Sequence, residues 1–191
     1  MGDYRAIAGA CEAVKDILRS AFDPAQFDRT IEFKVYTGKD FEEPISTGLS
    51  LFLYRIFHFG VNKTPSGRLD NNGKRMRPKL PLELHVLLTS WAPTADLQHK
   101  LIGWAMRVLE DTPIISSAVL RMNNSKIFFN DESIEIVPTE LSTENLFRIW
   151  ETVTDKNYQI SVPYVIRIVF LDSMYEEYIG VPVQQRDLEL K

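Results

Sequence analysis

The chain has 191 residues, of which 45% are hydrophobic and 11% aromatic, so it has ample apolar surface for a core, which excludes wholesale disorder. Its 22 Lys and Arg stand against 26 Asp and Glu, a net charge of -4 with both signs interspersed. This balance argues against nucleic acid as the main partner, because duplex-binding proteins usually carry a basic excess. Since one core commonly accommodates about 200 residues, we expect a single domain over residues 1–172 and a tail over residues 173–191.

Neither an export signal nor a membrane span is expected. The first residues lack a basic start followed by a continuous apolar run, and no stretch reaches the ~18 apolar residues of a membrane helix. The single Cys11 cannot form an internal disulfide. It lies on the apolar face of a helical pattern, so we expect a small core residue. The sequence therefore predicts a cytoplasmic protein without membrane insertion.

The first third of the chain is predicted to form a helix and two strands. Apolar residues recur at spacings of three and four from Asp3 to Phe22, which indicates a helix. Residues 30–36 alternate apolar and charged side chains, as in a half-buried strand, and residues 37–46 form a polar connection. Residues 47–59 are apolar or aromatic on both faces, which is typical of a strand in the middle of a sheet.

One long loop, residues 62–79, carries six basic residues and a single acid, Asp70. Loops of this length in compact domains are more often functional than neutral, and two clusters of turn residues predict a small hairpin within it. The loop has no aromatic residue on which a base could stack, so the charged rim of a protein interface fits better than a phosphate contact. A loop whose charges are merely solvated explains the sequence about as well. The candidate contact residues here are Arg68, Lys74, Arg75, Arg77 and Lys79.

A strand over Leu80 to Trp91 is predicted to pass directly into an amphipathic helix. Thr94 or Asp96 can cap this helix. Gly103 within it costs roughly 1 kcal/mol relative to alanine. Close approach of another backbone is the expected reason for that glycine.

The remainder of the chain predicts two short strands, a helix and a central strand. The segments KIFFN (126–130) and SIEIVP (133–138) have strand-like patterns, and Ser142 can cap the helix that follows. Residues 163–172 are apolar on both faces apart from Arg167. The whole order predicts an α+β fold in which helices pack on a single mixed or mostly antiparallel sheet.

No arrangement of residues indicates catalysis. The sequence lacks a nucleophile elbow, a metalloprotease motif, a phosphate loop and a dinucleotide fingerprint. His58, His85 and His99 have no second ligand at short spacing, and the adjacent acidic pairs lie in apparent loops. We therefore expect no metal, no cofactor and no enzymatic activity, and a core-anchoring role for the three tryptophans.

Three segments together resemble one known family. Residues 80–114 and 141–173, with GLSLFLYRI (48–56) and the basic loop after it, are similar to the cap or tail-terminator proteins of phage-tail-like contractile injection systems. The similarity spans most of the chain, although the polar insert from Lys63 to Lys74 is longer. The resemblance implies a phage-terminator-like fold and a homo-hexameric ring that sits on the end of the inner tube and sheath of a particle and stops their polymerisation.

The resemblance carries no site residues over, so the remaining candidates come from the tail. From Met174 onward the sequence loses periodicity and suits an arm that contacts a neighbour. The candidate contact residues of the tail are Tyr175, Tyr178, Val181 and Val183. Two other functions stay open: another assembly component of the same particle, such as a baseplate or sheath adaptor, and a small-molecule enzyme, which would need a pocket with convergent polar groups.

Overall fold

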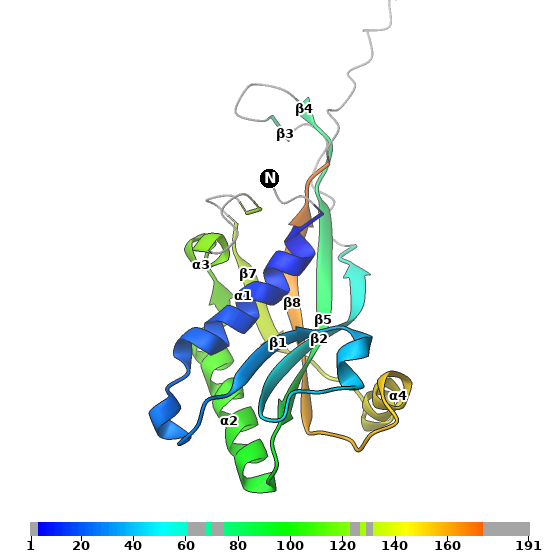
Figure 1. Ribbon diagram of the computed structural model, residues 1–191. Coiled ribbons are helices and arrows are strands. Elements are labelled where there is room, and N and C mark those ends of the chain that lie inside the picture. Colours follow the sequence, from blue (N-terminus) through cyan, green and yellow to red (C-terminus); the bar gives the residue numbers. More distant parts are fainter. Residues whose placement is uncertain (1–3, 61–67, 70–74, 123–126, 129–131, 174–191) are drawn as a thin grey trace, which may run out of the picture.

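The computed structural model describes residues 4–60, 68–69, 75–122, 127–128 and 132–173. These residues form a six-stranded sheet with helices on both faces and a two-stranded hairpin beyond one end of the sheet (Figure 1). Every neighbouring pair in the main sheet is antiparallel except β1 and β2. In spatial order the strands are β1 (Glu32–Tyr36), β2 (Gly48–His58), β5 (Leu80–Trp91), β8 (Ser161–Leu171), β7 (Ile134–Pro138) and β6 (Ile114–Ile115), and the hairpin joins β3 (Arg68–Leu69) to β4 (Arg75–Met76). The predicted α+β fold with a mixed sheet and the predicted small hairpin are both confirmed.

Two helical layers cover the sheet unequally (Figure 1). On one face lie α1 (Ala6–Ala21), α2 (Ala95–Asp111) and α3 (Ser117–Met122), and on the other lies α4 (Thr143–Val153) beside the 3-10 turn η2 (Gly38–Phe41). A second 3-10 turn, η1 (Pro24–Gln26), follows α1. None of the helices in the described ranges is both long and apolar enough to cross a bilayer.

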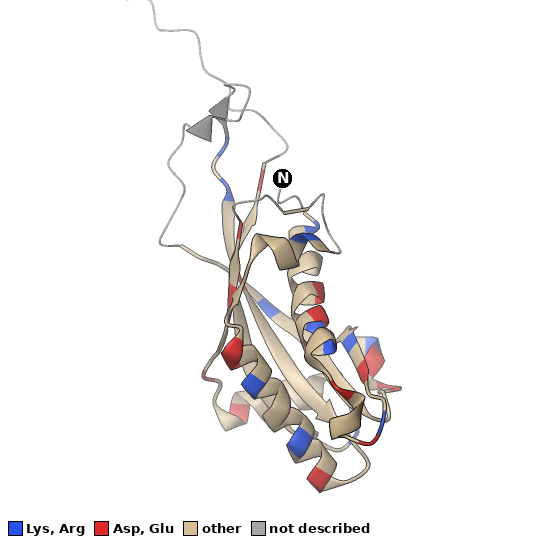
Figure 2. Ribbon diagram, turned by 90° about the vertical axis from the view of Figure 1, so that its left-hand side faces the viewer, with Lys and Arg blue, Asp and Glu red and all other residues tan. Residues whose placement is uncertain are grey.

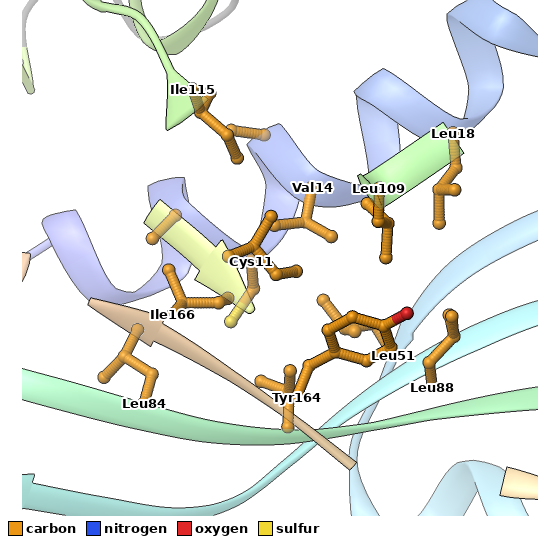
Figure 3. Packing of buried hydrophobic residues seen from close by; sticks show 14 of the residues in the cluster. Cys11, Val14, Leu18, Leu51, Leu84, Leu88, Leu109, Ile115, Tyr164 and Ile166 are labelled. Atoms are coloured by element: carbon orange, nitrogen blue, oxygen red, sulfur yellow. The ribbon is translucent and has the colours of Figure 1, made fainter. Parts of the chain in front are cut away.

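The main core lies between the three-helix layer and the sheet. Val14, Leu84, Leu109 and Ile166 are fully buried there, and they come from two helices and the two central strands (Figure 3). Cys11 packs among them, as predicted, and burial, aided by the charge of Glu12, raises the pKa of its thiol to about 12. Such a thiol stays protonated and unreactive at neutral pH.

A second, smaller core lies on the opposite face under α4. Trp91 and Trp150 are buried in it with ring centroids 6.0 Å apart, and Phe41 packs edge-on against Trp150. Tyr36 closes the cluster, since its hydroxyl accepts the backbone N–H of Ile45 at 2.8 Å. The polar connection over residues 37–46 nevertheless buries two apolar side chains, those of Phe41 and Ile45.

One sequence prediction is wrong, and another finds no support within the chain. Gly103 is exposed, and a Cβ placed on it would meet no atom of the described residues within 4 Å beyond the backbone of its own helix, so no other described segment of the chain approaches it. The segment KIFFN does not form a strand at Ile127 and Phe128, which are buried in a turn and a bend; residues 126, 129 and 130 lie outside the described ranges. These two adjacent apolar residues are buried in the main core without belonging to a strand. The predicted caps are confirmed, because Thr94 accepts the N–H of Leu97 at 3.4 Å and Ser142 that of Asn145 at 3.2 Å.

Candidate interaction surface

Both predicted contact regions adjoin the same end of the sheet. β2 finishes at His58, opposite Leu82, and β5 begins at Leu80, opposite Leu171 at the finish of β8. We call this the exit end, because the loop 62–79 connects β2 to β5 there and the tail follows β8 there. Figure 1 places the hairpin β3–β4 beyond it. The points at which these two regions leave the sheet, about a hundred residues apart in sequence, thus lie at the same end of it.

The basic candidates differ in what they can offer a partner. Arg68 pairs with Met76 and Leu69 with Arg75 in the hairpin backbone, but these side chains, like all of Lys74, lie outside the described part of the chain. Arg77 is exposed. Their role in an interface stays a prediction.

Lys79 is held inside the protein. Its side chain is only 10% exposed, and its Nζ lies 2.8 Å from Oε1 of Glu132 and 3.3 Å from Oδ1 of Asp172. The two carboxylates come from the segment before β7 and the residue after β8, so the ammonium ties together three segments at the exit end. Lys79 therefore balances buried charge and presents little surface.

The tail candidates Tyr175, Tyr178, Val181 and Val183 lie outside the described residues. Their contact role likewise stays a prediction. What the structure describes is the last residue from which the tail departs: Ser173, directly after Asp172 and its ion pair with Lys79.

One feature of the surface was not predicted, namely that only half of β2 is internal. β5 pairs with β2 along its full length, whereas β1 pairs only with Gly48 to Phe52. On that side Leu53–His58, which we call the open edge, has no neighbouring strand among the described residues. Ile56 is 46% exposed on it. Apolar or aromatic residues occur on both faces in both halves of β2, so this pattern does not reveal which half β1 pairs with.

The sheet face next to the open edge is aromatic, and none of the helices in the described part of the chain covers it (Figure 1). The ring of His85 lies 5.1 Å from that of Phe57 and 6.1 Å from that of Tyr54, and the guanidinium carbon of Arg55 lies 3.5 Å from the Phe57 ring centre. Burial lowers the pKa of His85; Arg55 acts in the same direction and Glu83 against it. At neutral pH this face therefore presents an uncharged imidazole.

The geometry separates the three histidines. His58 pairs with Leu82, three positions along β5 from His85, which corresponds to about 10 Å. His99 belongs to α2 on the opposite face of the sheet. Across the residues that the structure describes, no group of three His, Cys, Asp or Glu could hold a metal ion.

A shallow hollow of about 350 Å³ lies near the exit end. Phe59, Ile134 and Phe170 contribute to its walls. The charged groups that also line it, Arg167 and Glu135, bind each other at 2.9 Å (Nε to Oε2). In this hollow the charges of Arg167 and Glu135 are therefore directed at each other. Elsewhere, the helices carry both acidic and basic residues (Figure 2).

Two solved structures share this fold. The sheath/tube terminator of the extracellular contractile injection system PVC, in its extended state, superposes with a TM-score of 0.65 at 15% identity, covering 97% of this chain and 63% of that one. The tube-terminating cap of the anti-feeding prophage gives a TM-score of 0.61 at 13% identity, covering 94% and 59%. The chain thus spans less than two thirds of the length of either.

The sequence itself supports the same relationship. No curated protein matches the chain. A family model does: the model described as the Pvc16 N-terminal domain matches residues 9–185, nearly the whole of the sequence. The chain therefore belongs to the Pvc16 N-terminal domain family.

Proposed function

We propose that this protein is a structural cap, which forms a ring at the end of the tube and sheath of a contractile injection system and terminates their polymerisation. The observation that carries the proposal is the likeness in fold, over 97% of the chain, to a sheath/tube terminator. Membership in the Pvc16 N-terminal domain family and the likeness to a second tube-terminating cap point the same way.

The physical task of a cap asks for two unlike faces. One face must match the last ring of the polymer, and the other must fail to template the next ring. The two ends of the sheet are unlike in this sense. Only the exit end adjoins the basic loop and the tail, while α2 begins near the opposite end, after Trp91.

The proposed partners are further copies of this chain, in a homo-hexameric ring, and the tube and sheath subunits. Head-to-tail contacts between identical subunits close into a ring when the rotation between neighbours closes, which gives the ring a physical basis. The basic loop suits an acidic surface on one of these partners. In this proposal the chain is a non-enzymatic component without a cofactor, synthesised in the cytoplasm and incorporated there into the particle.

A polymerisation assay tests the proposal. Purified chain is added to polymerising tube subunits, with and without sheath, and particle lengths are measured in negative-stain images while light scattering gives the mass of the free chain. We expect shorter particles that carry ring density at one end. Particles of unchanged length, or free ends without density, would contradict the cap function. In particles assembled with a baseplate, density at the baseplate end would identify an adaptor instead.

The loop and the tail can be tested in the same assay. Arg75→Glu with Arg77→Glu should abolish capping if the loop meets an acidic surface. Lys100→Glu with Arg107→Glu, which makes the same charge change on the exposed side of α2, is the matched control and should cap normally. Deletion of residues 181–191 should reduce ring formation; unchanged rings and caps would exclude the arm.

A further inference from the structure

The open edge of β2 has a backbone ready to accept another strand. Phe59 donates its backbone N–H to the carbonyl of Pro81 at 2.9 Å, so the backbone N–H and C=O groups of Phe59, and of the residue two positions before it, point toward β5. Backbone groups of consecutive strand residues point to opposite sides. Ile56 and His58 therefore turn their N–H and C=O groups away from β5, toward the side that β1 does not reach.

This edge has little protection against pairing. Natural edge strands are usually blunted by lysine, proline or inward-pointing charge. From Leu53 to His58 the only charged residue is Arg55, and its guanidinium lies over the ring of Phe57. A register shift between Leu53 and Arg55, a bulge of the kind that also protects natural edge strands, lies at the start of the open edge and leaves Arg55–His58 as its regular part. With one charged residue in six, the edge suits a partner strand of similar length.

The tail contains one segment with the pattern of such a strand. Residues 178–185, YIGVPVQQ, are uncharged, between Glu176-Glu177 and Arg186-Asp187. Ile179, Val181 and Val183 alternate there, and β-branched residues at every second position favour a strand. Proline is tolerated in an edge strand when its position faces solvent. With Pro182 turned outward, the three β-branched residues turn their N–H groups toward the acceptor.

The chain connectivity favours an acceptor on a second copy. β5 lies between β8 and β2 in the sheet. To pair with β2 of its own chain, the tail would leave the end of β8 and cross the connection that joins β2 to β5 at the same end of the sheet. Connections rarely cross at one end of a sheet. A neighbouring copy in a ring has no such obstacle, and every copy then donates one strand and accepts one.

We propose that residues 178–183 of one copy add a strand to the open edge, Leu53–His58, of the next copy and thereby close the ring. This inference rests on the proposed function for the ring itself and names the contact that forms it. The contact is head-to-tail, so its repetition closes a ring without a second kind of interface.

Two pairs of variants test the contact. On the tail, Val181→Pro removes an N–H that faces the acceptor, whereas Gly180→Pro removes one that faces away. On the edge, Ile56→Pro removes an outward N–H, whereas Ile56→Val keeps it. We expect Val181→Pro and Ile56→Pro to weaken self-association of the full chain at least about tenfold in sedimentation velocity, and both controls to stay within about twofold of the wild type. Circular dichroism melting verifies that each variant is folded.

Mixing the two disabled variants identifies the donor and the acceptor. Ile56→Pro keeps an intact tail and Val181→Pro keeps an intact edge, so their mixture can form one contact and should give heterodimers but no rings. Amide exchange of residues 53–58 should slow in the mixture relative to Ile56→Pro or Val181→Pro alone.

Three outcomes would overturn the inference: association unchanged by either variant, equal effects of Val181→Pro and Gly180→Pro, or a mixture that stays monomeric. The last would indicate pairing within one chain. These readouts do not depend on capping. If the wild type fails to shorten particles but its self-association responds to the variants as expected, the proposed function is refuted and the contact is retained. If the wild type shortens particles but its self-association does not respond to the variants, the contact is refuted and the proposed function is retained.

Discussion

At the scale of single residues, the structure requires glycine at position 48 but not at position 103. Gly48 has a φ of 157°, and a Cβ there would overlap the backbone carbonyl of Glu32. Gly103 has open space around it. The same residue type therefore has opposite consequences at the start of β2 and in the middle of α2.

Alanine substitutions at these glycines should change stability in opposite directions. Gly103→Ala should raise the free energy of unfolding by up to about 1 kcal/mol, because alanine loses less backbone entropy in a helix. Gly48→Ala should lower it, because β1 must move away from β2 to accommodate the methyl group. Urea denaturation of both variants measures the two effects. Destabilisation by Gly103→Ala would show that the helix does not tolerate a side chain there.

Lys79 permits a second test at this scale. Lys79→Met should lower the free energy of unfolding by about 3 kcal/mol, because it leaves the carboxylates of Glu132 and Asp172 mostly buried without their cation. Lys100→Met is the control, since its ion pair with Asp96 is exposed and such pairs contribute less than about 1 kcal/mol. Equal effects in thermal or urea denaturation would mean that the Lys79 site is as solvated as the surface.

At the scale of secondary structure elements, α4 has one buried anchor, Trp150, beside the partly buried Leu146 and Val153. Trp150 is the only residue of α4 that is buried, and it contacts Phe41, Trp91 and Tyr158. Its indole N–H is buried without a hydrogen-bond partner in the described part of the chain, whereas that of Trp91 donates to Ser50 at 2.7 Å. Packing therefore holds this helix on the sheet.

Trp150→Ala should detach α4 while the main core stays folded. Loss of a buried tryptophan costs about 3–5 kcal/mol, and that loss falls on the smaller core. Amide exchange should become fast across residues 143–153 and stay slow in β5. Phe147→Ala, on the same helix but 45% exposed, is the control and should leave both regions protected. Fast exchange in β5 as well would show that the two cores unfold together.

At the scale of the whole molecule, association and stability should be coupled. If copies bind each other only when folded, mass action stabilises the folded state as concentration rises. The midpoint of thermal unfolding should then increase with protein concentration for the wild type and for Ile56→Val, and should be independent of it for Ile56→Pro. A concentration-independent midpoint for the wild type, measured by calorimetry in a range where sedimentation shows rings, would contradict this coupling.

Much of the fold was predictable from the sequence because its signals are local. The long strands, the two capped helices and the central position of residues 163–172 follow from periodicity and from single capping residues within a few positions. Ile127 and Phe128 show the limit, since their apolar pattern predicts burial correctly and strand wrongly. A segment forms a strand only where another strand pairs with it, and the local apolar pattern does not predict that partner.

The candidate surface was predictable only in part, for the same physical reason. The sequence by itself determined where a basic loop and an apolar tail segment occur, and that Cys11 and the tryptophans suit a core. Only the tertiary structure decided that Lys79 forms ion pairs with two carboxylates from distant segments, and that β1 ends before it can pair with Leu53–His58. Local sequence sets which elements form, whereas pairing between segments far apart in the chain sets which edges and charges remain available to a partner.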